Sequence, residues 1–308
     1  MGRADVAEHI AVLSNPFAGK GRGARETEVA VAHLRSRGAD VRAYTGESAA
    51  SSRLLATRAL DARPGVLVVV GGDGTLSGIL DVVCAAGVPV VLVPAGTGND
   101  LARALGLPRR DAVAAAELAL TGIPRTIDVG EVRAADRVDL FLTIAALGFD
   151  AKVSDRTNRL RWPRGVLRYY LALVVELVRL RPMDFTVSLD GAEPVHVPGT
   201  LVAVGNTPSY GGGMPLCVGA AADDGMLDIV HVAPLTRLRL LRLFPLLLRG
   251  VHLARREVTR RQARTVTVSA PGLVVYADGE RIAEDECMIG IRRSALAVLV
   301  PSGAGGTP

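Results

Sequence analysis

The 308-residue chain contains few lysines and few aromatic residues. Lys20 and Lys152 are its only lysines, so arginine carries nearly all of the positive charge behind a formal net charge of +5. This balance favours anionic partners, such as nucleotide phosphates or an acidic membrane surface. Aromatic residues make up 4% of the chain, which is too few for a surface that stacks bases, and we therefore expect no nucleic-acid partner.

Cysteines and long apolar runs are also scarce. Cys84, Cys217 and Cys287 lie far apart without the spacing of metal ligands, which predicts buried thiols in a reducing compartment. Asp5 and Glu8 interrupt the first ten residues, which excludes a signal peptide there. No apolar run approaches the roughly 18 residues of a membrane-spanning helix. We expect a cytoplasmic protein, and peripheral contact with the inner face of the membrane is allowed.

The first part of the chain alternates short apolar strands with helical patterns. Apolar residues make up 49% of the sequence, which is enough for a substantial core. Short links join the segments, a pattern typical of a doubly wound parallel sheet in an α/β domain. The expected strands cover 9–15, 40–45, 66–70 and 88–94, and the expected helices cover 24–37, about 48–61, 75–86 and 99–105.

After about residue 125 the pattern changes to short β-rich runs separated by turn signals, which predicts a mainly antiparallel β domain. Helical segments interrupt it near 165–181 and 235–256. We expect an α/β nucleotide-binding domain over 1–128, to which a final strand at about 293–302 returns. The β-rich domain would cover 129–292, and a disordered tail 303–308.

Three glycine-rich loops each follow a predicted strand in the first domain. They read NPFAGKGRG (15–23), GGDGTLSG (71–78) and PAGTGND (94–100). Because parallel strands end at the same edge of a sheet, the loops should gather there, and their backbone N–H groups suit phosphate oxygens. The Walker A pattern and a G-x-G-x-x-G after the first strand are both absent. This excludes a P-loop nucleoside triphosphatase and an ordinary Rossmann dehydrogenase.

Taken together, NPFAGKG, GGDGT, PAGTGNDLAR, DDGMLD and DGE resemble the diacylglycerol kinase catalytic family. The likeness is greatest to its soluble bacterial lipid kinases, relatives of sphingosine and ceramide kinases, and covers about residues 10 to 300. GGDGT alone is shared with NAD kinases, whereas GTGNDLAR at this distance is more specific. The resemblance implies an NAD-kinase-like first domain and a second domain that receives a lipid.

The resemblance also implies ATP and Mg²⁺ as cofactors. Asp73 would orient the Mg²⁺ on ATP, directly or through water, because phosphoryl transfer depends on positioning and charge neutralisation. For Asn99 and Asp100, helix capping and ligand contact both remain open. The implied nucleotide contacts are Asn15, Pro16, Phe17, Ala18, Gly19, Thr45, Gly72, Asp73, Gly74, Thr75, Leu76, Ser77, Gly78 and Thr97.

A second site is expected at YADGERI, where the resemblance makes Glu280 the general base that deprotonates the lipid hydroxyl. Partial burial would raise its pKa toward neutrality. Taken alone, ADGE is a hairpin turn, and Asp278 within it would support the base or the metal.

A structural Mg²⁺ is implied at Ala221, Asp224 and Met226, with Asp128 connected to it. Ala221 and Met226 would bind through main-chain oxygen, as suits a hard cation. The alternative is a polar turn between strands.

Ser77 and Gly78 depart from the family, which commonly has Asn-Glu at these positions. We expect an ATP- and Mg²⁺-dependent lipid kinase whose acceptor is diacylglycerol. The alternatives are an NAD-kinase-like or other small-molecule kinase, and a non-catalytic nucleotide- or lipid-binding regulator. A homodimer is allowed.

Segment 168–181 is strongly apolar with aromatic residues and arginines at its edges, and segment 235–249 interleaves arginine with leucine. Either would lie in the headgroup plane of a membrane, or pack as an ordinary helix on the β domain. Loop 209–216 would border the acceptor cleft.

Overall fold

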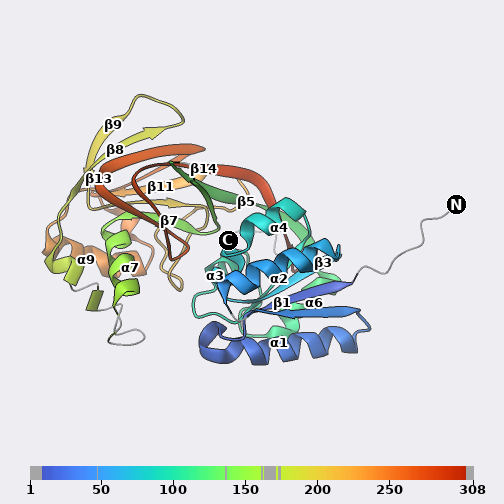
Figure 1. Cartoon of the computed structure of the whole chain (residues 1–308). Helices are drawn as coiled ribbons and strands as arrows, with labels where there is room; N and C mark the ends of the chain where they lie inside the picture. The colour runs from blue at the N-terminus through green and yellow to red at the C-terminus, as the bar shows by residue number, and fades with distance from the viewer. Residues whose placement is uncertain are drawn as a thin grey trace. The chain divides into compact units, whose positions relative to one another are not determined.

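The structure is a computed structural model that describes residues 9–46, 48–135, 137–160, 162, 171–172 and 175–302. The chain forms two compact units (Figure 1). The first contains the residues up to Ile127 and those from Ser294 onward, and the second is Asp128–Arg293.

A parallel sheet forms the centre of the first unit. β1 pairs with β2 and with β3, β3 pairs with β4, and the last part of β14 joins β4, where Val298 lies opposite Val90. β1, β3 and β4 are rich in branched aliphatic residues because helices cover both faces of a doubly wound sheet, whereas β2 at the edge is only partly buried. Their bounds are β1 (Ile10–Ser14), β2 (Val41–Thr45), β3 (Val66–Gly71) and β4 (Val90–Pro94). The predicted α/β class is confirmed.

Helices connect these strands, and they differ from expectation in three respects. The first starts six residues early because Gly19, Lys20 and Gly21 coil in left-handed geometry at its beginning. The helix expected over 75–86 is broken at Gly78 and Ile79 into two helices. A further helix starts where the Asp111 side chain accepts from Ala114 N. The helices are α1 (Ala18–Ser36), α2 (Ala49–Asp61), α3 (Asp73–Ser77), α4 (Leu80–Ala86), α5 (Asp100–Ala104) and α6 (Ala112–Thr121).

The second unit is mainly antiparallel, as predicted. Its main sheet runs β12–β11–β10–β7–β13–β14; β8 and β9 extend from β13, and β5 and β6 pair with each other. Phe141 and Phe185 are fully buried in its core. The strands are β5 (Ile123–Ala134), β6 (Arg137–Phe141), β7 (Ile144–Gly148), β8 (Met183–Leu189), β9 (Val195–Gly199), β10 (Leu201–Gly205), β11 (Leu227–Val232), β12 (Val258–Ala263), β13 (Thr265–Ala277) and β14 (Glu280–Val300).

Two described helices pack on this unit. α7 (Phe149–Arg159) was not expected, whereas α9 (Arg237–Leu248) falls within the predicted segment 235–256. A short 3₁₀ helix, His252–Ala254, follows α9. Much of the other predicted helical segment, 165–181, lies outside the described residues, as does the tail 303–308. Among the helices that are described, none is both long enough and apolar enough to cross a membrane.

None of the three cysteines forms a disulfide. Cys217 and Cys287 are buried as expected, and burial raises the pKa of the Cys287 thiol to about 12. The expectation was wrong for Cys84, which is only half-buried because it lies on α4 beside the solvent-facing Asp81.

Candidate functional site

The three glycine-rich loops of the first unit meet at the carboxyl edge of its parallel sheet. Arg22, from the first loop, donates through Nη2 to the carbonyls of Gly96 (2.6 Å) and Ala95 (3.2 Å) in the third loop. A Cβ on Gly19 would lie 1.9 Å from the Ala95 carbonyl oxygen, so only glycine fits there. The backbone of the first loop therefore lies directly against the third.

The second and third loops also touch backbone to backbone. A Cβ on Gly96 would lie 2.5 Å from the Cα of Gly72, closer than real Cβ atoms approach. A Cβ on Gly74, in contrast, would meet no atom within 4 Å. Close contact with the backbone of Gly72 thus requires glycine at position 96. The space beside Gly74, in contrast, is open to a ligand.

Asp73 joins the second loop to the helix that follows the third. It is the first residue of α3, and its Oδ2 accepts from the backbone N–H of Asp100 at 3.0 Å. Its Oδ1 accepts from Leu101 N at 3.3 Å. The carboxylate therefore caps α5, where the helix dipole also stabilises its negative charge.

Asn99 and Asp100 have different roles from simple caps. Asn99 precedes α5 in left-handed geometry (φ 54°) and donates through Nδ2 to the Gly96 carbonyl at 3.0 Å. Asp100 is buried, with Oδ1 3.6 Å from Nε of Arg103. Capping of α5 thus comes from Asp73, a partner that the motif GTGND by itself does not reveal.

The remaining predicted nucleotide contacts lie around the same edge. Asn15 accepts from Phe17 N through Oδ1 at 3.0 Å, while the Phe17 side chain is 67% exposed. The hydroxyls of Ser14 and Thr45 lie 3.1 Å apart and join the ends of β1 and β2. The other positions follow the same loops. Pro16 lies just before α1, and Ala18 and Gly19 begin it; Thr75, Leu76 and Ser77 are the last residues of α3, which Gly78 follows. Thr97 is exposed in the third loop.

This edge offers backbone N–H donors and the carboxylate of Asp73, but not a complete set of side-chain ligands for a metal ion. Among the described residues, no three His, Cys, Asp or Glu side chains form a group that could hold a metal ion. Mg²⁺ commonly binds through one or two carboxylates, with phosphate oxygens and waters completing its shell. The donors of this edge therefore fit a Mg²⁺ that arrives with a triphosphate.

Glu280 follows a tight hairpin turn in the second unit. Ala277 and Glu280 pair across β13 and β14, and Asp278 and Gly279 both have positive φ (49° and 86°), the geometry of a two-residue type I′ turn. Glu280 is exposed because it lies directly beside the turn, at the tip of the hairpin, so its carboxylate lacks the expected partial burial.

Asp278 anchors that hairpin to the segment between β6 and β7. Its carboxylate accepts from Leu142 N at 2.7 Å, from Thr143 N at 2.9 Å and from the Thr143 hydroxyl at 2.5 Å. These three hydrogen bonds to one carboxylate hold the turn rigidly. Because Glu280 lies only two residues after Asp278, its backbone is held in place as well.

A cluster next to Glu280 was not predicted from the sequence. Tyr276 donates its hydroxyl to Asp155 Oδ1 at 3.0 Å, and Nη1 of Arg281 lies 3.8 Å from the same oxygen. Asp155 lies on α7, while Tyr276 and Arg281 flank the ADGE turn. The turn motif pointed to the two flanking residues, but no local pattern pointed to Asp155.

The third predicted group, around Asp224, forms a tightly bonded loop. Asp128 accepts from Gly225 N through Oδ2 at 2.7 Å, and its own N–H donates to the Ala222 carbonyl at 2.6 Å. Asp224 accepts from Met226 N through Oδ1 at 2.9 Å. Ala221 adjoins this loop and has no side-chain donor of its own.

Carboxylates crowd this loop. Burial raises the pKa of Asp224, and repulsion from Asp228, Asp128 and Asp223 raises it further. A divalent cation bound by main-chain oxygens and one carboxylate would relieve this repulsion, so the donor set fits the predicted Mg²⁺.

Comparisons with known proteins agree with these features. Residues 9–132 match the diacylglycerol kinase catalytic domain, and residues 143–300 match the YegS C-terminal NAD kinase beta sandwich-like domain. The chain is 42% identical over 293 residues to a diacylglycerol kinase of Mycobacterium tuberculosis, covering 95% of each protein. It is 29% identical over 239 residues to a diacylglycerol kinase of Bacillus subtilis, covering 76% of each.

Solved structures share the fold. A diacylglycerol kinase from Bacillus anthracis superimposes with a TM-score of 0.73 at 19% identity, covering 96% of this chain and 98% of that one. An NAD kinase from Archaeoglobus fulgidus in complex with ATP gives a TM-score of 0.54 at 14% identity, covering 96% and 95%. At these identities the likeness concerns the fold alone.

Proposed function

Because the chain belongs to the diacylglycerol kinase catalytic family and is a lipid kinase, we propose that it transfers the γ-phosphoryl group of ATP to the hydroxyl of diacylglycerol, which yields phosphatidic acid and ADP. The 42% identity to a diacylglycerol kinase along 95% of the chain carries this proposal. An NAD-kinase activity rests only on a shared fold at 14% identity.

The loop edge of the first unit is the proposed triphosphate site. Backbone N–H groups of the loop at Gly72 and Gly74 would donate to phosphate oxygens, and the open space beside Gly74 would receive them. Asn15, Thr45 and Thr97 would line the rest of the nucleotide. Asp73 would hold the Mg²⁺ directly or through water, while the two backbone N–H groups that its oxygens accept fix the direction of the carboxylate. When bound, Mg²⁺ supplies charge neutralisation to the phosphates.

Glu280 is the proposed general base. Its carboxylate would take the proton from the lipid hydroxyl as the oxygen attacks phosphorus and ADP leaves. Asp278 keeps the hairpin in place through its three bonds to Leu142 and Thr143, so the base would be presented from a rigid turn. Asp155 accepts a hydrogen bond from Tyr276 next to this turn and would help to hold the hairpin in place.

The loop around Asp224 is the proposed site of a structural Mg²⁺, bound by the main-chain oxygens of Ala221 and Met226 and by the Asp224 carboxylate. Its role would be to stabilise the loop between the buried Asp128 and β11. Removing the ion would then lower stability without removing a reacting group.

We also propose peripheral contact with a membrane, because a diacylglycerol acceptor resides in the bilayer. The exposed leucines and arginines of α9 support this contact. Homodimerisation stays a prediction.

The test is a reaction with labelled ATP, Mg²⁺ and a total lipid extract, followed by identification of the labelled product by mass. Phosphatidic acid is the expected product. A labelled product from NAD, or no product from any lipid despite ATP binding, would contradict the proposal.

The base assignment has a separate test. Glu280→Gln should abolish turnover while ATP binding persists, because only the proton acceptor is lost. Glu286→Gln removes an exposed carboxylate from the same strand and should keep turnover. Full activity of Glu280→Gln would eliminate the assignment.

A further inference from the structure

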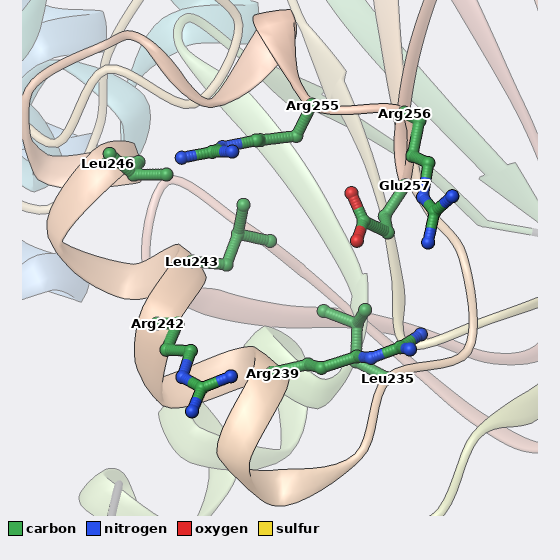
Figure 2. A pocket seen from close by; sticks show the side chains of 8 residues that line it. All are labelled: Leu235, Arg239, Arg242, Leu243, Leu246, Arg255, Arg256 and Glu257. Atoms are coloured by element: carbon green, nitrogen blue, oxygen red, sulfur yellow. The ribbon is translucent and has the colours of Figure 1, made fainter.

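A small basic pocket lies beside α9 in the second unit. It has a volume of about 260 Å³ and is lined by Leu235, Arg239, Arg242, Leu243, Leu246, Arg255, Arg256 and Glu257 (Figure 2). Figure 2 shows Arg255 extending across the pocket toward Leu246, with Leu243 facing its centre. Four arginines face one glutamate, so the pocket suits an anion.

Several other arginines among the described residues are paired with carboxylates. Arg53 pairs with Asp81, and Arg133 and Arg292 both pair with Glu131. Within the part of the chain that the structure describes, no ion pair joins any pocket arginine to a carboxylate. Guanidinium groups bind phosphate through paired N–H donors, so free arginines around a pocket are suited to a phosphate.

The other side of α9 is held in the core. Leu240, Leu243 and Leu247 are buried in an apolar cluster with Leu201 and Val230 of the sheet. The helix begins at Thr236, whose side chain accepts from Arg239 N at 3.4 Å. The packing therefore decides which residues of α9 must face outward.

The outward residues form a stripe of large apolar side chains. Leu238, Leu241 and Leu248 are 67%, 52% and 53% exposed, and Pro245 between them is exposed as well. Spacings of three, four and three residues place all four on one face of a helix. Arg242, which follows Leu241 on α9, is exposed and lines the pocket. Leucines flanked by arginines are typical of a helix that lies in a membrane interface.

We propose that this face of α9 docks on an anionic phospholipid bilayer, with the pocket taking the phosphate of a lipid headgroup and the leucine stripe entering the acyl boundary. The inference rests on the proposed function, since the acceptor is a membrane lipid. A second copy of the chain fits this face poorly. A two-fold dimer would bring the same patch against itself, arginine against arginine.

Vesicle flotation of the full chain tests the proposal. The protein should float with vesicles of phosphatidylcholine mixed with phosphatidylglycerol and not with phosphatidylcholine alone, and added salt should weaken binding. Arg239→Gln with Arg242→Gln should weaken partitioning about 30-fold, from the usual contribution of two surface arginines.

The matched control is Arg58→Gln with Arg110→Gln. Both residues are exposed in the first unit, and their replacement removes the same charge. The control should float like the wild type. Leu238→Ser with Leu241→Ser should weaken binding and leave its salt dependence unchanged. Thermal unfolding confirms that each variant is folded.

Flotation of the Arg239/Arg242 variant at the wild-type level would overturn the proposal, as would equal losses in the control. If the wild-type protein is a dimer in solution and the Leu238/Leu241 variant is a monomer, this face serves self-association instead.

Turnover of short-chain diacylglycerol in detergent separates this inference from the kinase assignment. The Arg239/Arg242 variant should retain that turnover while losing vesicle binding. A wild-type protein that binds anionic vesicles yet phosphorylates no lipid would defeat the proposed function and leave the docking surface standing.

Discussion

The carboxylate of Asp73 accepts a hydrogen bond from the backbone N–H of Asp100, with 3.0 Å between oxygen and nitrogen. The bond joins the GGDGT loop to the helix that begins in GTGND, two motifs separated by a strand and two helices. One side chain therefore holds two glycine-rich loops in register, in addition to any role toward a metal. This double role makes Asp73 the first position to test.

Asp73→Asn keeps the shape of the side chain but removes its charge, and leaves one carbonyl oxygen for two N–H groups. We expect kcat to fall by about 100-fold or more, by analogy with the loss of one preorganised electrostatic group. Stability should fall by about 1 kcal/mol because one N–H of α5 loses its acceptor. Kinetics and urea unfolding measure the two effects. Asp81→Asn, on the exposed first turn of α4, is the control, and unchanged kcat in Asp73→Asn would contradict the expectation.

Glycines 96 and 74 should respond differently to alanine. Gly96→Ala places a Cβ 2.5 Å from the Cα of Gly72, and the loops must move apart. We expect a loss of roughly 1–3 kcal/mol of stability, as for other overpacked sites, and a higher KM for ATP. Gly74→Ala meets no protein atom within 4 Å, so stability should be unchanged or higher.

In Gly74→Ala the KM for ATP should still rise, because the new methyl group would occupy the proposed phosphate space. A normal KM for ATP in this variant would argue that the phosphates lie elsewhere.

Thr143→Val removes the hydroxyl that donates to Asp278 and preserves the side-chain volume. Stability should fall by about 1 kcal/mol, since one hydrogen bond to a charged, partly buried acceptor is lost. If Asp278 positions Glu280, kcat should also fall about tenfold while the KM for ATP stays constant. Thr259→Val, on the exposed face of β12, should change neither quantity. A stability loss without any change in kcat would reduce Asp278 to a structural role.

Asp150 should make stability depend on pH. Burial of its carboxylate outweighs a hydrogen bond from Tyr210 and raises its pKa from 3.8 to about 6. Between these two values the folded state holds the proton more often than the unfolded state. The free energy of unfolding contributed by Asp150 therefore falls as the pH rises through this range, and is constant above it.

Asp150→Asn lacks this titration. Its stability relative to the wild type should rise between pH 4 and pH 6, by at most about 3 kcal/mol. Urea unfolding of both proteins across this range measures the difference. If the free energies of unfolding of the two proteins change with pH in the same way, the Asp150 carboxylate is solvated and the expectation is wrong.

Much of the fold could be predicted from local patterns. The apolar runs at Val66–Gly71 and Val90–Pro94, each ended by a glycine loop, indicated buried parallel strands, because such strands need apolar side chains on both faces. The motifs GGDGT and GTGND indicated where a phosphate would bind and which family the chain belongs to. Other features were not predicted: the break after α3 and the helix α7 depended on packing that local spacing does not encode, whereas α6 has a local start signal in Asp111.

What tertiary structure decided were the partners of polar side chains. Asp73 meets Asp100 across 27 residues of sequence, and Asp278 meets Leu142 across 136. Likewise, the composition of α9 showed leucine and arginine, but only its packing showed which leucines remain exposed and which arginines surround a pocket. Hydrophobic periodicity is carried by neighbours along the chain, so sequence alone displays it. A hydrogen bond or a pocket depends on where distant segments are brought together, and that is settled only when the core closes.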